Sequence, residues 1–341
     1  MLQYFGMLDL DPEKTTDITA LLIGRVGDLI MGSAFLRSLN RHYPKARIRL
    51  VISGLCEQTA PLIPFIDDVQ VIHRFHKLFP NIKLAAGLIR TPCDLLVDLN
   101  PSFSRTSAAL ASVIASPVKL SFARGRLDAI FTRQIPAPGE GEHMLDRYAR
   151  LAAELGAPYE PQLEVRLNPA DEARAERIVT GIPAEPGGWR VLIHPGNFKK
   201  FDNRWPEDKF VALTDILLED PGLRLYYMSG PGEQARVQEI VSRLKKPVPV
   251  IPPVPLGVAG AVMRHMDICV LNITGTTHLA AALGVPTFGF YAGYTNAVWR
   301  PRGPQHAGVV SSCWGSCRDI TVEAAASTLK KTLQALSPRR N

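Results

Sequence analysis

Short apolar runs alternate with longer amphipathic stretches along the first half of the chain. Ile18–Ile23 predicts a buried strand, and Leu29–His42 predicts a helix because its apolar residues recur near helical spacing. Further strands are expected in this half at Ile48–Ile52, Val69–Ile72, Leu95–Val97 and Val118–Phe122. Alternation of strands and helices predicts a parallel sheet with helices on both faces.

The same rhythm restarts after a polar, proline-marked stretch over residues 159–188. Strands are expected there at Arg190–His194, Leu223–Met228, Val248–Ile251, Ile268–Leu271 and Thr287–Tyr291. Helices are expected at Glu207–Leu218, Glu233–Leu244, Pro255–His265, Thr276–Leu283 and Val322–Leu336. We expect an α/β protein with an N-terminal domain over 1–165, a linker over 166–188, a second domain over 189–320 and a C-terminal helix over 321–341. Two doubly wound halves would bind a ligand where the carboxyl ends of their strands meet.

Composition excludes several classes of protein. Hydrophobic residues make up 46% of the 341 residues and charged residues 21%, which excludes a disordered tail, a fibrous repeat and a coiled coil. The sequence contains no His-Glu-x-x-His pattern, no Walker P-loop and no Gly-x-Ser-x-Gly elbow, so hydrolase and metalloprotease readings have no support. The net charge of +7 suits an anionic partner such as nucleic acid, a phosphorylated substrate or an acidic membrane surface. A merely solubilising surface explains it equally well.

Cysteine usage and the lack of targeting segments indicate the cellular setting. The sequence contains five cysteines, an odd number that does not indicate a disulfide framework. This cysteine usage favours a protein of the reducing cytosol. Cys313 and Cys317 are expected as free thiols, with a zinc site as the alternative. Residues 1–14 do not resemble a signal peptide, and no window is apolar enough to span a membrane. We expect a cytoplasmic protein, with peripheral membrane association as a second expectation.

A glycine-containing turn, Gly24-Arg25-Val26-Gly27-Asp28, follows the first predicted strand and opens the first helix. Glycines let the backbone approach a ligand closely, and the unpaired amides of a helix start favour an anion. Asp28 at this place can accept a proton from a substrate. The alternative is that Asp28 only caps the helix.

A second turn, His194-Pro195-Gly196, follows the first strand of the second half. The basic loop after it contains three cationic residues, Lys199, Lys200 and Arg204. A tight turn, a basic loop and a helix begun by proline predict a phosphate clamp. A solvated basic loop over a buried Trp205 is the equal alternative.

A third motif places hydroxyl groups at a helix start. Thr274, Gly275 and Thr276 follow a strand, and their amides and hydroxyls can hold a diphosphate. His278 lies one turn into the helix and can donate to the same anion, unless it is a packed core histidine. Glu233 follows another strand end and can reach sugar hydroxyls, or can simply be a carboxylate at a helix N-terminus.

Taken in order, these motifs resemble the bacterial lipopolysaccharide heptosyltransferases of glycosyltransferase family 9. The resemblance covers roughly Thr19 to Leu333. The segments that carry it are Gly27-Asp28, Arg41-His42-Tyr43-Pro44, Cys93-Asp94-Leu95-Leu96-Val97-Asp98-Leu99, His194-Pro195-Gly196, Arg204-Trp205-Pro206 and Thr274-Gly275-x-x-His278 through Pro286.

The resemblance implies a GT-B fold, with two Rossmann-like domains facing a central cleft. It implies inverting, metal-independent transfer of a heptose from ADP-heptose to the lipopolysaccharide inner core at the cytoplasmic face of the inner membrane. Asp28 matches the general base, and Gly24, Arg25 and Gly27 form the loop on the acceptor side. Residues expected on the donor side are His194, Gly196, Lys199, Lys200, Arg204, Glu233, Thr274, Gly275, Thr276 and His278. No cofactor beyond the nucleotide sugar and no nucleic acid partner is expected; the partners are the donor, the anionic core acceptor and the membrane surface.

Two positions depart from the family pattern. Ile273 stands where the family usually has Asp, and Asn203 stands where it usually has Lys. We hypothesise that the two normally interact and were lost together. The departures keep two alternatives open, namely transfer of another nucleotide sugar or to another acceptor, and a catalytically weak nucleotide-sugar binding protein.

Overall fold

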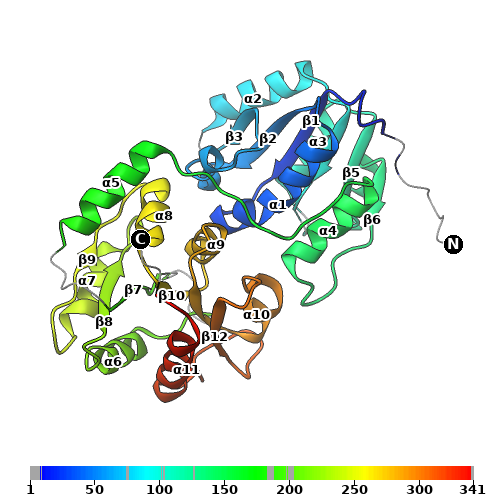
Figure 1. The fold of residues 1–341 in the computed structure, drawn as a ribbon. Coiled ribbons are helices and arrows are strands. Elements are labelled where there is room, and N and C mark those ends of the chain that lie inside the picture. The colour runs from blue at the N-terminus through cyan, green and yellow to red at the C-terminus, as the bar shows by residue number, and fades with distance from the viewer. Residues whose placement is uncertain are drawn as a thin grey trace. The chain divides into compact units, whose positions relative to one another are not determined.

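The computed structural model describes residues 8, 10–73, 77–100, 102, 104–125, 127–182, 188–196, 198 and 203–338. Contacts divide the chain into two compact units, Met1–Arg166 and Leu167–Asn341 (Figure 1). Each unit contains one parallel sheet, so the expected pair of α/β domains is confirmed.

The sheet of the first unit has six parallel strands in the order β3-β2-β1-β4-β5-β6. The strands are β1 (Asp17–Leu22), β2 (Arg47–Ser53), β3 (Asp68–Ile72), β4 (Leu95–Asp98), β5 (Val118–Phe122) and β6 (Arg133–Ile135). At the amino ends of β1 and β4, the Asp94 carboxylate accepts from the amides of Thr16 at 2.7 Å and Asp17 at 3.0 Å. These hydrogen bonds, led by that from Thr16, lower the pKa of Asp94.

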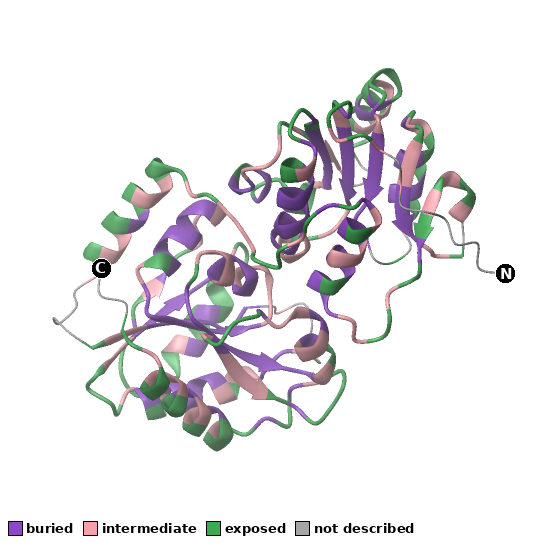
Figure 2. Cartoon of the chain, turned by 45° about the vertical axis from the view of Figure 1, so that its right-hand side comes forward, coloured by how far each residue is buried: buried purple, intermediate pink, exposed green. Residues whose placement is uncertain are grey.

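The helices of this unit are α1 (Val26–His42), α2 (Leu78–Arg90), α3 (Arg105–Val113) and α4 (Met144–Glu154). Short 3₁₀ turns lie at Gly54–Cys56, Ala60–Leu62 and Asp128–Ile130. Helix α1 packs on α4, and α2 packs on α3. The buried side chains of α2 and α3 join those of β1, β2 and β4 in one core cluster. Figure 2 shows the central strands buried and the outer helix faces exposed.

The second unit repeats this plan with the order β12-β11-β10-β7-β8-β9, again with parallel pairs throughout. The strands are β7 (Trp189–His194), β8 (Leu223–Met228), β9 (Val250–Ile251), β10 (Ile268–Asn272), β11 (Thr287–Tyr291) and β12 (His306–Val310). The Asp267 carboxylate accepts from the Arg190 amide at 2.7 Å, so it ties the start of β10 to β7 as Asp94 ties β4 to β1.

The helices of the second unit are α5 (Pro169–Thr180), α6 (Glu207–Leu217), α7 (Gln234–Ser242), α8 (Leu256–Arg264), α9 (Gly275–Ala282), α10 (Gly293–Trp299) and α11 (Val322–Ala335). Helix α8 packs on α5 and α9, whereas α6 packs on α7 and α11 (Figure 1). Trp205 is fully buried in the core beside α6. Its ring stacks on Phe290 with a centroid distance of 4.0 Å and an interplanar angle of 7°.

The structure contains elements that the hydrophobic pattern did not predict. Helix α5 lies within the segment expected as a linker, where the Asn168 side chain caps it and Pro169 occupies its first turn. The strands β6 and β12 were also missed, because β6 is three residues long and β12 contains Gly308 at its centre. In the described part of the chain, no helix combines the length and apolar character needed to cross a membrane.

Burial of a histidine in β12 predicts a pH-dependent stability. Burial lowers the pKa of His306 from 6.5 to about 4. Its ring nitrogens lie 2.9 Å from Thr287 Oγ1 and 3.0 Å from Gln305 Nε2. Between pH 6.5 and 4 the unfolded chain binds a proton that the folded chain does not, so the free energy of unfolding should decrease as the pH falls through this window.

Between pH 7 and pH 4 the free energy of unfolding should decrease by about 2–3 kcal/mol less in H306Q than in the wild type. Urea unfolding of both proteins across that range measures it. An unchanged slope in the variant would contradict the assignment to His306.

Candidate functional site

Ligands of doubly wound sheets bind outside the carboxyl ends of the strands, where the strand order reverses. In the first unit this point lies between β1 and β4, which are neighbours in the sheet. In the second unit it lies between β7 and β10. The motifs around Asp28, His194 and Thr274 directly follow β1, β7 and β10, so the topology brings them to these two points.

Asp28 occupies the third position of α1, and its carboxylate folds back over the turn before the helix. Asp28 Oδ2 accepts a hydrogen bond from the Arg25 amide at 2.7 Å. A Cβ at Gly24 would lie 2.8 Å from the same oxygen, so the glycine leaves the room that this carboxylate fills. Asp28 therefore makes a capping-box contact, whereas the N-cap residue of α1 is Arg25, and Asp28 remains partly exposed.

Two hydroxyl groups and a thiol lie close to this turn. The Ser53 hydroxyl donates to the Gly24 carbonyl at 2.5 Å, and the Tyr148 hydroxyl donates to the Asp28 carbonyl at 3.5 Å. Burial raises the pKa of the Cys56 thiol to about 12, with a smaller contribution from the charge of Asp28. The Cys56 side chain therefore stays a neutral thiol near the carboxylate.

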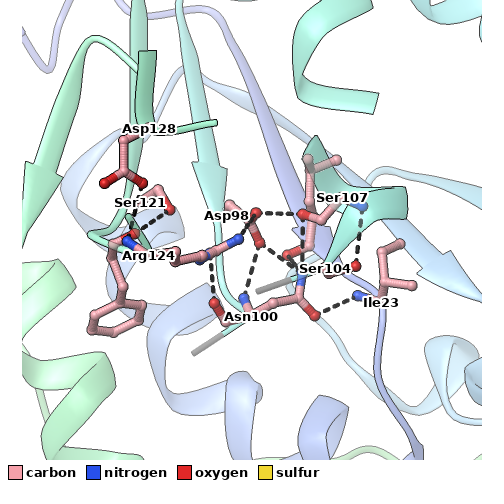
Figure 3. Close-up of polar contacts among 10 residues, drawn as sticks. Ile23, Asp98, Asn100, Ser104, Ser107, Ser121, Arg124 and Asp128 are labelled. Atoms are coloured by element: carbon pink, nitrogen blue, oxygen red, sulfur yellow. Dashed lines mark hydrogen bonds and ion pairs between the residues drawn. The ribbon is translucent and has the colours of Figure 1, made fainter. Parts of the chain in front are cut away.

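A buried ion pair stands next to this turn, at the carboxyl ends of β4 and β5. Asp98 Oδ2 pairs with the Arg124 guanidinium at 2.8 Å, and both side chains are almost fully buried. Asp98 also accepts from the Ser107 hydroxyl, and its Oδ1 accepts from the side-chain amide of Asn100 at 2.6 Å. The second terminal nitrogen of Arg124 donates to the Asn100 carbonyl at 2.6 Å (Figure 3).

Asn100 connects this network to the turn that carries Asp28. Its Oδ1 accepts from the Ile23 amide at 3.0 Å (Figure 3). Its Nδ2 lies 3.4 Å from the Leu21 carbonyl. An amide side chain accepts and donates at once, so it can hold two backbone segments together. The sequence signal was the polar Asp98 at the end of an apolar strand, but nothing in the pattern indicated Asn100 or Arg124 as its partners.

In the second unit His194, which ends β7, lies close to Glu233, which precedes α7. His194 is buried, and its Nδ1 lies 2.9 Å from the Met228 carbonyl oxygen. Its Nε2 lies 3.9 Å from Glu233 Oε2, which accepts from the Gly230 amide at 3.0 Å. A Cβ at Gly196 would lie 2.6 Å from His194 Nε2 and 2.9 Å from Glu233 Oε2. The turn therefore needs glycine at 196 because these two side chains already occupy the space.

Helix α9 begins where the third motif predicts a diphosphate site. Thr274 is the residue before the first turn, and its Oγ1 lies 2.6 Å from Thr276 Oγ1. Thr277 Oγ1 accepts from the Thr274 amide at 3.2 Å, which fixes the start of the helix. His278 is buried, with its ring 5.9 Å from that of Trp299, as the core-histidine alternative expects.

The segment after the basic loop is fixed to the end of β10 by Asn272. Asn272 Oδ1 accepts from the Trp205 amide at 2.8 Å, and its Nδ2 donates to the Pro195 carbonyl at 3.0 Å. The Arg204 guanidinium pairs with Glu207 at 3.2 Å and lies 5.5 Å from the Phe198 ring. Glu207 also pairs with Arg236 at 2.9 Å, so Arg204 shares this carboxylate with a second cation. Lys199 and Lys200 lie outside the described residues.

Among the residues that the structure describes, no group of three or more His, Cys, Asp or Glu side chains could hold a metal ion. Cys313 is exposed and Cys317 is buried, and both are thiols. Burial raises the pKa of Cys317 to about 12, which disfavours the thiolate that binds zinc.

The buried pair predicts a large loss of stability when one partner is removed. We expect D98A to lower the free energy of unfolding by about 3–5 kcal/mol, because Arg124 would keep a buried, uncompensated charge. Urea unfolding of the full chain measures it. The control is R41A, which removes an exposed pair with Glu160 and should cost at most about 1 kcal/mol. Equal costs in the two variants would contradict the prediction.

Comparisons with known proteins agree with the fold. Residues 82–325 match the model of glycosyltransferase family 9 (heptosyltransferase). Lipopolysaccharide heptosyltransferase 1 of Escherichia coli K12 is 28% identical over 190 residues, which cover 54% of this chain and 57% of that protein. The match thus spans little more than half the length of this relative.

Two solved structures share the fold. A family 9 glycosyl transferase from Veillonella parvula superposes with a TM-score of 0.82 at 18% identity, over 96% of this chain and 99% of the other. The E. coli heptosyltransferase WaaC, solved with ADP, gives 0.72 at 19% identity, over 93% and 100%. The expected GT-B fold class is confirmed by these likenesses. Since the family model covers well over half of the chain, the protein belongs to glycosyltransferase family 9, the heptosyltransferase family.

Proposed function

We propose that this protein is an inverting glycosyltransferase that moves a heptose from ADP-heptose to the lipopolysaccharide inner core. The observation that carries the proposal is the match of residues 82–325 to the heptosyltransferase family. The name of the E. coli relative and the ADP in the WaaC structure support the acceptor and the donor. The proposed setting is the cytoplasmic face of the inner membrane, with the protein bound peripherally.

In the proposed reaction Asp28 is the general base. Its carboxylate takes the proton of the acceptor hydroxyl as that oxygen attacks the anomeric carbon of the heptose. The new glycosidic bond forms on the face opposite the departing ADP, whose bond to the anomeric carbon breaks with its electron pair on the phosphate oxygen. The partly exposed position of Asp28 at the switch point of its sheet supports this role.

The proposed donor site lies at the carboxyl ends of β7, β8 and β10. The amides at the start of α9 and the hydroxyls of Thr274 and Thr276 would stabilise the charge that develops on the diphosphate. Glu233 is proposed to bind the ribose hydroxyls, with His194 beside it. No cofactor beyond the nucleotide sugar is proposed.

A different donor is the second candidate. It is favoured by Ile273 and Asn203, which lie beside the contact of Asn272 with Trp205 and replace the two charged residues usual in the family. A donor site without these two charges would bind a different nucleotide sugar. Absence of transfer from ADP-heptose in the assay below would favour this candidate.

The Asp28 role predicts a selective loss of turnover. We expect D28N to lower kcat by about 10²- to 10⁴-fold while ADP binding stays nearly unchanged, because the amide oxygen can still accept from the Arg25 amide but cannot take a proton. The assay follows ADP release and the mass of a heptose-deficient lipopolysaccharide acceptor, without added metal.

The matched control is D171N, since Asp171 also stands third in its helix, α5. It should transfer heptose at the wild-type rate. A D28N protein as active as wild type would exclude Asp28 as the base. A wild-type protein that binds ADP-heptose without turnover would favour a binding protein or another acceptor.

The crowding at Gly196 predicts a donor-binding defect. We expect G196A to weaken ADP binding at least about tenfold, because the added Cβ displaces His194 or Glu233. Calorimetric titration with ADP measures it. The control is G315A, where an added Cβ meets nothing within 4 Å and binding should stay at the wild-type value. Equal affinities in the two variants would remove Glu233 and His194 from the donor site.

A further inference from the structure

Helix α2 has apolar side chains on two opposite faces. On the inner face, Leu84 and Leu88 are buried in the core cluster of the first unit. On the outer face, Phe79 is 86% exposed, Ile82 55% and Ile89 56%. At about 100° per residue these three side chains form one stripe along the helix. Figure 1 shows α2 along the outside of its unit. A surface helix normally presents polar residues there, so the outer stripe needs a partner.

The charged residues of α2 and of the segment directly before it are all cationic. Lys83 and Arg90 are exposed and lie along one edge of the stripe, on the side of Phe79. Lys77, which immediately precedes the helix, is also exposed. From residue 69 to residue 93 the sequence contains no Asp or Glu, although 32 of the 341 residues are acidic. A partner that fits this helix must therefore have a negatively charged surface with an apolar interior beneath it.

A second copy of the chain fits this face poorly. A two-fold dimer through α2 would bring Lys83 and Arg90 of both copies close together without a carboxylate on either helix, and like charges oppose such an interface. A lipid surface meets both requirements, because acyl chains accept the stripe while anionic headgroups pair with the cations. Lysine and arginine stems are long enough to reach the headgroups from a helix that lies in the interface.

We propose that α2 docks on an anionic phospholipid surface, lying in the interface plane with Phe79, Ile82 and Ile89 inserted and with Lys83 and Arg90 at the headgroups. The docking rests on the peripheral membrane setting of the proposed function and is independent of which sugar the protein transfers. It makes α2 the membrane-facing element of the first unit.

The test is sedimentation of the full chain with vesicles of phosphatidylglycerol and phosphatidylethanolamine, compared with vesicles of phosphatidylcholine. Wild type should bind the anionic vesicles and bind the neutral ones at least about tenfold more weakly. The double variant F79S/I82S should lose about tenfold or more in partitioning, since it removes much of the inserted apolar area. The double variant K83Q/R90Q should lose about tenfold and most of the salt dependence.

Matched controls lie in the second unit. I216S removes an exposed apolar side chain of α6, and K330Q/K331Q removes two exposed cations of α11; both should bind vesicles as wild type does. All variants should keep the wild-type thermal midpoint. In addition, F79W should show quenching by brominated lipid that wild type lacks.

Three results would overturn the proposal. They are equal binding to anionic and neutral vesicles, unchanged binding of F79S/I82S, and a wild-type dimer that F79S/I82S abolishes in the absence of any vesicle binding. Transfer to a detergent-dispersed acceptor, measured in parallel, separates this proposal from the proposed function. If transfer is intact and vesicle binding is absent, the docking surface is wrong and the enzyme assignment stands.

Discussion

An asparagine side chain at the switch point of each sheet fixes the turn that follows the first strand. In the first unit Asn100 accepts from the Ile23 amide, and in the second Asn272 donates to the Pro195 carbonyl. Each asparagine follows or ends the fourth strand of its sheet in chain order. Because Asp28 comes shortly after Ile23 and Gly196 directly follows Pro195, one amide side chain holds the backbone before each proposed ligand-binding turn.

Different interactions hold the two asparagines in place in the two units. Asn100 belongs to a buried network with Asp98 and Arg124, whose charges tolerate burial only because they are paired and hydrogen-bonded. Asn272 instead holds the backbone of Trp205, whose ring is stacked on Phe290. Loss of one charge would disrupt the network around Asn100, whereas loss of aromatic volume would disrupt the packing of Trp205. A shared topology has thus been stabilised by unrelated side chains.

The sequence predicted the repeating strands because β1, β7 and β11 are apolar runs whose residues are buried on both faces. It could not predict α5, since only Ala175 of that helix is buried and its apolar periodicity is therefore weak. It placed Asp28 and Thr274 at helix starts correctly, because glycines and hydroxyls there are local signals. The partnership of Arg124 with Asp98 joins residues 26 positions apart, and local patterns carry no information on such contacts.

The ties between first and fourth strands also have a consequence for how the chain acquires its structure. Ile23 and Asn100 are 77 positions apart, and so are Pro195 and Asn272, as well as the aspartate contacts at the opposite strand ends. In the first unit β1 can pair with β2 soon after both are synthesised, but its partner residues on β4 lie 77 positions later in the chain, as in the pair Ile18 and Leu95. Until then the turn before Asp28 lacks the hydrogen bond from the Ile23 amide to Asn100. In each unit the central strand pair can therefore close only after the fourth strand has been synthesised, while two further strands of the sheet still follow.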